Sequence, residues 1–352
     1  MTALTAPAQP ERDASPRPLP WRRMAGVTWR QHRFTLAGLV ALLGVLALGL
    51  WLAGLQLHHA YAAVAACRPA LSPACLDLTD TFNWANGLLA NGIILQAVPP
   101  LIGAFVGAPV LARELESGTF RFAWTQGFGR WRWALAKLVL LAVAVTAAAA
   151  VFSLMLSWYY QPYFAPGNQA LGLTELTPFF PGLFDLHGVA FAAWTLAAFS
   201  VGALAGMLIR RVVPAIAAAL AVYAGLAFAA GGYLRGHYLT ALTGRNLNLP
   251  GSAWILSQWW TKGGTVLSQD TMRQVFQSTL QLIAPVVPSK AQKLRTFNDV
   301  TVYLTRHGYT QWTRYQPGSR LWPFQWIEGG WLLALSVLLV GATIWLVRRR
   351  AA

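Results

Sequence analysis

Few side chains in this sequence have the types and the spacing that chemistry requires. His58 and His59 are adjacent, and Asp185 lies two residues before His187. Imidazole and carboxylate groups can hold a metal ion or activate water, but each of these pairs supplies only two ligands, which is too few for a metal site. The phosphate-binding pattern GxxxxGK[ST], the zinc-binding pattern HExxH and the nucleophile pattern GxSxG do not occur in the 352 residues. We therefore expect no catalytic residue, no metal site and no bound cofactor in this chain.

The two cysteines of the sequence, Cys67 and Cys75, form a further pair whose chemistry depends on the compartment. Seven residues separate them, and Pro69 and Pro73 can turn the chain between or beside them. Outside the cell a disulfide would persist, and closing so short a loop would contribute about 2–3 kcal/mol against local unfolding. We therefore expect a disulfide, with two free thiols as the alternative.

The elements that carry these residues consist mainly of apolar sequence. Hydrophobic residues make up 56% of the chain and charged residues 11%, against roughly 25% charged residues in an ordinary soluble domain. Six runs contain no Asp, Glu, Lys or Arg, and each is long enough to cross a bilayer core of about 30 Å. The sequence therefore predicts an all-α membrane protein with six transmembrane helices. The runs are 34–55, 88–112, 138–158, 188–209, 212–233 and 329–347.

The distribution of basic residues predicts the orientation of these spans. With the N-terminus inside, sixteen of the 27 basic residues fall on inner segments, whereas the outer loops 56–87 and 159–187 hold only Arg68 and four acidic residues. Basic residues concentrate on the cytoplasmic side of membrane proteins. We therefore expect both termini to be cytoplasmic, in a plasma membrane. The net charge of +16 is then a consequence of topology, and we expect no nucleic-acid partner.

The segments outside the spans complete the predicted domain organisation. Residues 1–19 are rich in Pro, Ala and Arg and are expected to be a disordered cytoplasmic tail. Residues 20–33 are basic and aromatic, which predicts a helix on the inner membrane surface or, alternatively, a charged flank that only sets orientation. Spans one to five then occupy 34–233, and the sixth span with a basic cytoplasmic tail occupies 329–352.

Residues 234–328 are too numerous for a plain connector between the fifth and sixth spans. Apolar residues at helical spacing follow Asp270 and Asn298, which could cap two helices. We therefore expect a small, mainly helical extracellular domain. Several tryptophans around it could mark the outer lipid–water interface. Among them are Trp254, Trp259 and Trp260.

Two polar residues, Asn91 and Gln96, stand out in the second apolar run. Polar groups inside a membrane face a cavity or a partner helix, because lipid offers them no hydrogen bond. The two side chains could therefore line a substrate path or, alternatively, form hydrogen bonds between helices. In the fourth run, the small residues at 202–206 favour close helix packing.

The inner loop 113–137 is the most informative stretch of the sequence. Glu114 and Glu116 precede Gly118 and Thr119, which can end one helix and cap another. A short apolar helix is expected over 120–126, and basic residues then lead back into the membrane. Such a helix, held just below the bilayer, is suited to receive a push from a soluble partner. The alternative role of the two glutamates is a solvated hinge between helices.

This arrangement of glutamates, Gly-Thr, an apolar turn and basic residues resembles the coupling loop of type-2 ABC transporter permeases. The six-span layout and the large segment before the last span are similar too, and Trp124-Thr-Gln126 and residues 315–328 resemble permeases of the actinobacterial type. The resemblance implies a separate ATPase subunit that carries ATP and Mg²⁺, a second permease copy in a homodimer or heterodimer, and surrounding membrane lipids. The residues that it assigns to ATPase coupling are Glu114, Glu116, Gly118, Thr119, Phe120, Trp124, Thr125, Arg130 and Lys137.

The function that this resemblance implies is that of a permease subunit in a bacterial plasma membrane, exporting an amphipathic substrate. ATP-driven closure of the ATPase would push the short helix and switch a central cavity from inward-facing to outward-facing. The alternative is a cell-envelope anchor or sensor whose outer domain binds a ligand or partner without transport. Retention of an ATPase subunit during purification would distinguish the two.

Overall fold

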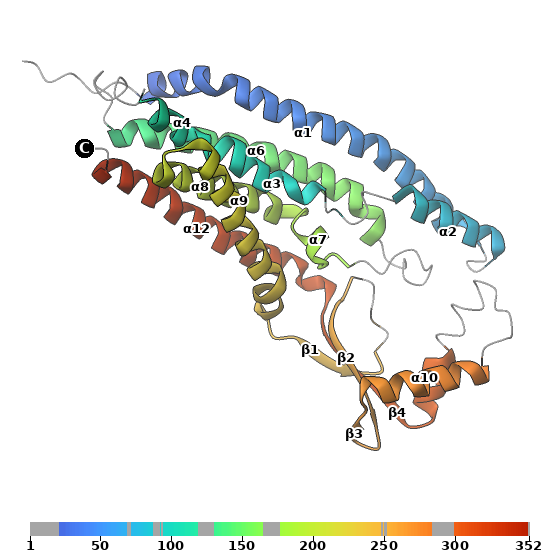
Figure 1. The fold of residues 1–352 in the computed structure, drawn as a ribbon. Coiled ribbons are helices and arrows are strands. Elements are labelled where there is room, and N and C mark those ends of the chain that lie inside the picture. The colour runs from blue at the N-terminus through green and yellow to red at the C-terminus, as the bar shows by residue number, and fades with distance from the viewer. Residues whose placement is uncertain are drawn as a thin grey trace, which may run out of the picture.

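The computed structural model describes residues 21–68, 72–86, 92, 94–118, 130–164, 177–247, 249, 252–283 and 299–350. Within these ranges six helices are long and apolar enough to cross a membrane, and they lie side by side as a bundle (Figure 1). The predicted all-α membrane fold with six spans is therefore confirmed. The spans are Met24–Ala66, Leu95–Ser117, Trp131–Phe164, Gly188–Ile209, Val212–His237 and Gly318–Arg349.

Several of the spans are built from more than one helical element. The first is α1 (Trp21–Ala66), the fourth is α8 (Gly188–Ile209), and short helices α2 (Pro73–Asn86) and α7 (Pro181–Phe184) lie outside the spans. The other four spans are composite. The second span comprises η2 (Leu95–Ala97), α3 (Val98–Ile102), η3 (Gly103–Gly107) and α4 (Pro109–Ser117), and the third comprises α6 (Arg130–Tyr160) and η4 (Gln161–Phe164). The fifth comprises α9 (Val212–Ala229), η5 (Ala230–Leu234) and η6 (Arg235–His237). The sixth comprises η7 (Gly318–Arg320) and α12 (Leu321–Arg350).

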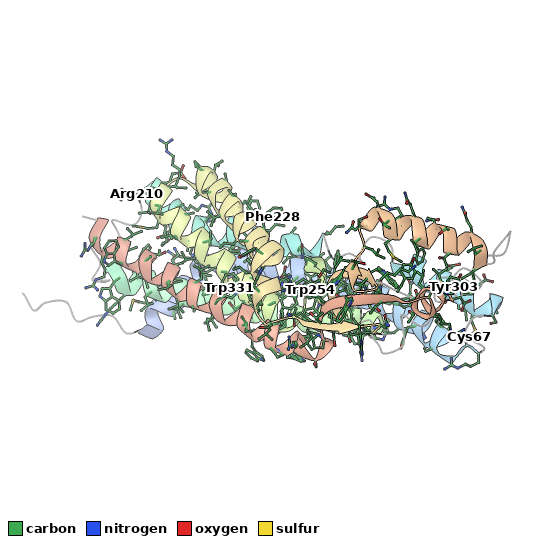
Figure 2. The ribbon with its side chains drawn as sticks, turned by 90° about the horizontal axis from the view of Figure 1, so that it is seen from below. Cys67, Arg210, Phe228, Trp254, Tyr303 and Trp331 are labelled. Carbon is green, nitrogen blue, oxygen red and sulfur yellow. A yellow bond between two sulfur atoms is a disulfide. The ribbon has the colours of Figure 1, made fainter. Side chains whose placement is uncertain are left out.

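Helix α8 is the centre of the bundle. It packs against α6, α9, α12 and the composite second span, and its large side chains Trp194 and Phe199 are fully buried. Helix α9, by contrast, exposes most of its surface: Phe228, on this helix in Figure 2, is 82% exposed, and Val213 is 76% exposed. Apolar surface of this extent requires lipid or another protein against it.

The second span approaches α8 through glycines, as the small residues at 202–206 predicted. A Cβ atom on Gly103 would lie 2.5 Å from the carbonyl oxygen of Ala198, and one on Gly202 would collide with the carbonyl oxygen of Gly103. Glycines four residues apart therefore let the two backbones touch. In the same place η3 is a π-helix, in which the Ala108 amide bonds the Gly103 carbonyl at 2.9 Å. Pro109, which follows, lacks an N–H and disturbs the α-helical ladder before it.

The surface helix expected at residues 20–33 is not a separate element. Residues 21–33 form the first turns of α1, which continues without interruption for 46 residues. The 46 residues of α1 contain no proline. The α-helical hydrogen bonds therefore continue through the boundary between basic and apolar sequence at Arg33 and Phe34. At a rise of 1.5 Å per residue, α1 is about 69 Å long and extends well beyond a bilayer core.

In its described residues, the segment between the fifth and sixth spans combines helices with a sheet that the expectation of a mainly helical domain did not include. It contains a four-stranded antiparallel sheet of order β1-β4-β2-β3 beside α10 (Gln269–Ile283) and helical residues 299–306. Strands β2 and β3 form a hairpin through Gly263 and Gly264, whose φ angles of +56° and +86° suit the tight turn. The strands are β1 (Leu242–Arg245), β2 (Trp254–Lys262), β3 (Thr265–Val266) and β4 (Tyr309–Gln316).

The two predicted helices of this segment do form, although the first is capped differently. The Ser268 hydroxyl accepts a hydrogen bond from the Thr271 amide at 3.1 Å, so Ser268 caps α10 and Asp270 lies in its first turn. Trp254, Trp259 and Trp260, three of the tryptophans predicted at the lipid–water interface, lie on β2, and Trp259 stacks on Trp312 of β4 with ring centroids 6.4 Å apart. Trp254 stacks on Phe179 at 5.7 Å and joins the sheet to the bundle.

Candidate functional site

The two helices that flank the predicted coupling loop are both described. Helix α4 ends at Ser117, and Gly118 follows with a φ of +74°, a left-handed conformation that glycine adopts without strain. Helix α6 begins at Arg130. The predicted coupling residues that lie outside the described ranges are Thr119, Phe120, Trp124 and Thr125. The role of the loop in binding an ATPase therefore stays a prediction, and the ends of the loop supply the observations.

A buried ion pair joins the two ends of the loop. Lys137 of α6 donates to the Glu114 carboxylate of α4. The Lys137 side chain is only 2% exposed, and its ammonium lies 5.3 Å from the centre of the Trp133 ring. A buried ammonium needs an opposite charge, because leaving it unpaired costs several kcal/mol. Glu114 therefore holds α4 and α6 in a fixed relation directly above the loop.

Glu116 joins the same end of α4 to the fifth span. Its Oε2 atom accepts a hydrogen bond of 3.0 Å from the backbone amide of Val212, the first residue of α9. Arg211 at the N-cap position makes no side-chain capping bond, so Glu116 supplies from another helix the acceptor that the first turn of α9 lacks. Its negative charge also suits the positive end of the helix dipole. Glu116 therefore connects the C-terminal end of α4 to the first turn of α9.

Gln96, the described polar residue of the second run, lies at the beginning of that span. The Gln96 amide donates a hydrogen bond of 2.9 Å to the carbonyl oxygen of Pro181 in α7, which agrees with the alternative of bonding between elements. Asn91 lies outside the described residues. Their place in a substrate path stays a prediction.

A set of charges that the sequence analysis did not bring together lies at the other end of the fifth span. Arg235, Glu328 and Asp185 meet there, and we call them the buried charge cluster. The Arg235 and Glu328 side chains are fully buried, while 22% of the Asp185 side chain is exposed. Arg235 bonds Glu328 through Nε at 3.1 Å and through Nη2 at 2.7 Å, and Nη2 also donates to Asp185.

Neutral side chains complete the coordination of Glu328. Trp194 of α8 donates to its carboxylate at 2.9 Å and Tyr238 donates at 3.0 Å. The Tyr238 hydroxyl in turn accepts from the Trp331 indole at 2.9 Å. Charge-assisted bonds of this kind are the stronger class of hydrogen bond. The cluster thus joins α8, the end of the fifth span, the start of α12 and the turn before α8.

The environment of the cluster shifts the pKa values of Asp185 and Tyr238, which lie outside the spans. Burial raises the pKa of Asp185 to about 7; the Arg235 guanidinium lowers it, and the Glu328 carboxylate raises it. Burial also raises the pKa of Tyr238 above its ordinary value. The Asp185 and Glu328 carboxyl groups both contact the Arg235 guanidinium. Asp185 is the carboxyl that takes up a proton most readily.

Sequence reasoning missed this cluster because its members are 50 and 93 residues apart from Arg235 along the chain. A signal was nevertheless present: Arg235 directly follows one apolar run, and Glu328 directly precedes another. Ionised groups at such positions require partners. Each therefore predicts an opposite charge nearby.

His58, His187 and the two cysteines considered at the outset have structural contacts. His58 stacks on Trp158 at 4.6 Å and contacts its carbonyl oxygen at 3.1 Å. Burial lowers the pKa of His187 to about 4. Cys67 and Cys75 form a disulfide, with Cα atoms 5.7 Å apart, which ties the end of α1 to α2.

Comparison with known proteins places these features in a family. The family model described as ABC-2 membrane transporter related matches residues 40–235, which include most of α1, the coupling loop and α9 up to Arg235. No curated protein and no solved structure matches the chain. Members of the matched family are membrane subunits of transporters. Because the match covers more than half of its residues, the chain belongs to the ABC-2 membrane transporter related family.

Proposed function

We propose that this chain is the membrane subunit of an ABC exporter and is driven by a separate ATPase that docks on the loop 113–137. The observation that carries the proposal is the hydrogen bond between Glu116 and Val212, which links the end of α4, at this loop, to the first turn of α9. The family membership supports the transport role. Because the sequence has no phosphate-binding loop, ATP and Mg²⁺ belong to the ATPase.

The arrangement of the ends of the bundle supports an orientation with the loop in the cytoplasm. Arg210 lies at one end of the molecule, whereas Cys67 and Tyr303 lie at the opposite end (Figure 2). The C-terminal end of α12, with Arg348 and Arg349, lies on the same side as the ends of α4 and α8 (Figure 1). Basic residues favour the cytoplasmic side. The disulfide and the sheet then lie outside the cell, where a disulfide persists.

The proposed coupling follows the contacts of α4. Closure of the ATPase on ATP displaces the loop, and the Glu114–Lys137 ion pair moves α4 and α6 together. Glu116 passes the displacement to the start of α9, whose far end enters the buried charge cluster. The two ends of the fifth span therefore respond together, and the cavity between copies of the permease changes its access from one side to the other.

The exposed surface of the bundle supports a second permease copy within membrane lipids. Side chains on α9 such as Phe228 and on α1 such as Phe34, which is 75% exposed, have no protein against them in the single chain. The spans contain no charged lining at their centres, which agrees with an amphipathic cargo. Direction and cargo are part of the proposal.

The experiment is co-purification of the tagged chain with the ATPase encoded beside it, comparing wild type with Glu116→Lys and with deletion of 120–125. We expect the ATPase to be retained by wild type and lost from both variants. Asp270→Lys is the matched control, because Asp270 is an acid 86% exposed on α10, at the far end. Retention by the two loop variants would remove the coupling role, and no retention by wild type would favour an anchor or sensor.

Orientation is tested separately with single cysteines in a background lacking Cys67 and Cys75. A membrane-impermeant maleimide should label Ser278→Cys on the exposed face of α10 in intact cells, and Ser117→Cys only after lysis. The opposite labelling pattern would invert the topology and refute the proposal.

A further inference from the structure

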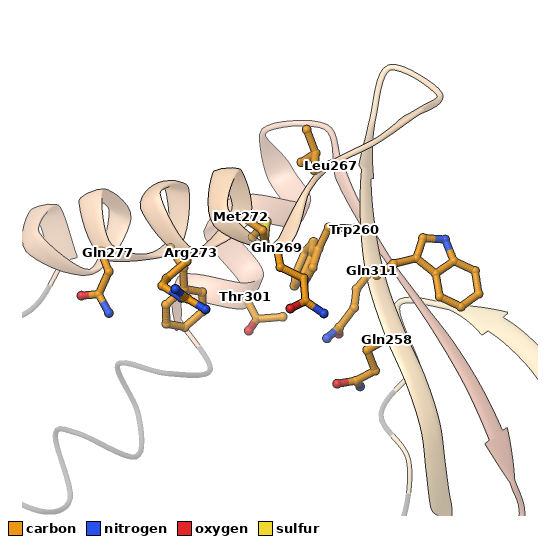
Figure 3. A pocket seen from close by; sticks show the side chains of 11 residues that line it. Gln258, Trp260, Leu267, Gln269, Met272, Arg273, Gln277, Thr301 and Gln311 are labelled. Carbon is orange, nitrogen blue, oxygen red and sulfur yellow. The ribbon is translucent and has the colours of Figure 1, made fainter. Parts of the chain in front are cut away.

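The segment between the fifth and sixth spans contains a groove that neither the coupling site nor the buried charge cluster uses. It lies between α10 and the sheet, and its volume is about 800 Å³ (Figure 3). Sites for small ligands have volumes of about 300–1,000 Å³. The groove is thus large enough for a ligand of several rings.

The sheet contributes one wall of the groove. Gln258 and Trp260 are two residues apart in β2, so their side chains point to the same face, and Gln311 of β4 is the cross-strand partner of Trp260. All three line the groove and point toward α10 in Figure 3. The neighbouring pair Trp259 and Trp312 alternates to the other face of the sheet. The wall toward α10 therefore consists of the Trp260 ring and two amides, and Trp259 also contributes to the lining.

Helix α10 contributes the opposite wall. Gln269, Arg273 and Gln277 line the groove at intervals of four residues, which places them in a row along one helix face. The row extends over about 12 Å at 1.5 Å per residue. Met272 and Phe276 lie beside it and pack into the small core of this segment. Apolar side chains thus form the base of the groove and polar ones form its rim.

Part of the polar lining is available to a ligand, whereas the Gln258 amide donates to the Thr313 hydroxyl at 3.3 Å. Among the described residues, the side-chain amides of Gln269, Gln277 and Gln311 have no hydrogen-bond partner. Each amide can both donate and accept hydrogen bonds. The charged residue of the lining, Arg273, forms an ion pair of 3.5 Å with Asp270. The groove therefore presents neutral donors and acceptors around an aromatic surface.

We propose that this groove binds a neutral oligosaccharide. Sugar hydroxyls donate and accept as amides do, and the apolar face of a sugar ring packs on an indole such as Trp260. A lipid tail would leave the amides without partners, which is unfavourable. A peptide that binds by adding to an unpaired strand edge is disfavoured, because this groove is walled by a sheet face and a helix face. The row of polar side chains on α10 suits a chain of sugars.

The test uses the full chain in lipid nanodiscs on an array that carries neutral oligosaccharides, acidic oligosaccharides and peptides, followed by titration of the strongest neutral oligosaccharide. The variant is Gln269→Ala/Gln277→Ala. The control is Gln274→Ala/Gln281→Ala, which changes two exposed glutamines of the same helix that do not line the groove. We expect the control to bind like wild type and the variant to bind at least tenfold more weakly, because two amides are lost.

Equal affinity of variant and wild type would overturn the proposal, and so would wild-type binding to peptides or acidic sugars alone or to nothing on the array. Gln311→Ala, on the opposite wall, is expected to weaken binding in the same direction, which separates a loss of contacts from a local distortion of α10. The proposal is independent of the transport role: an ATPase that does not co-purify leaves the result on the array unchanged.

Discussion

Replacing Glu328 by glutamine tests whether the buried charge cluster holds the bundle together. The substitution preserves the shape of the side chain and removes its charge. The carboxylate of Glu328 accepts four hydrogen bonds from described residues, two of them from Arg235. A glutamine amide cannot accept on its nitrogen, so at least one buried donor then faces another donor.

The expected cost follows from the burial of the pair. Removing one partner of a buried ion pair costs about 3–5 kcal/mol, because the remaining charge is left uncompensated. Arg235 retains Asp185 as a partner in the variant, so we expect a value at the lower end, about 3 kcal/mol. For a chain of this size this corresponds to a decrease of about 6 °C in the thermal midpoint.

The assay is thermal unfolding of the purified chain in nanodiscs. Asp270→Asn is the control, because its ion pair with Arg273 lies on the surface and contributes less than about 1 kcal/mol. The double variant Arg235→Met/Glu328→Met should be less destabilised than the sum of its single variants, since both charges leave together. An unchanged midpoint for Glu328→Gln, or strict additivity in the double variant, would refute the reasoning.

Three further predictions concern other parts of the molecule. Because the pKa of Asp185 is raised to about 7 from 3.8, its contribution to stability is complete below about pH 4 and is lost as the pH rises through about 7. The thermal midpoint of wild type should therefore fall over that range, and that of Asp185→Asn should fall less. Gly202→Ala should lower the yield of folded protein in size-exclusion chromatography, because its Cβ would collide with the Gly103 backbone at a cost of about 3 kcal/mol. The control Gly225→Ala, at a position with open space around it, should fold like wild type. Equal yields of the two variants would contradict the contact. Replacing Cys67 and Cys75 by serine should speed amide hydrogen exchange in α2 by the equivalent of about 2–3 kcal/mol, and unchanged exchange would show that the disulfide does not constrain this end.

The spans were predictable from the sequence because insertion into lipid excludes charge over a fixed length. The run 138–158, for example, lies wholly inside the third span, Trp131–Phe164. The ends of the helices were not predictable in the same way. A helix that leaves the membrane does not have to stop, because its backbone hydrogen bonds continue in water, and α1 therefore includes the basic residues that precede its apolar part.

The sheet was missed because tryptophan is favoured in two different settings in a membrane protein. Rings such as Trp259 suit the lipid–water interface, and they equally suit a strand. The alternation in β2, where Trp260 packs with the core beside α10 and Trp259 stacks on Trp312 of β4, distinguishes the two uses. Of the predicted coupling residues, the structure brings Glu114 and Lys137 together. It also shows the contact of Glu116 with Val212, which no local pattern could predict because 96 residues separate the two.

The fifth span unites these observations, because charged ties hold both of its ends. Glu116 holds the first amide of α9, and the buried charge cluster holds Arg235 just after η5. Little of the length between them is fixed by burial: Ala215 and Ala219 are buried, but much of the helix is exposed. The helix is bonded at both ends and is little buried along its middle. It can therefore move along its axis as one rigid element. Loss of the Glu116 tie should therefore leave the bundle folded, whereas loss of Glu328 should loosen the bundle itself.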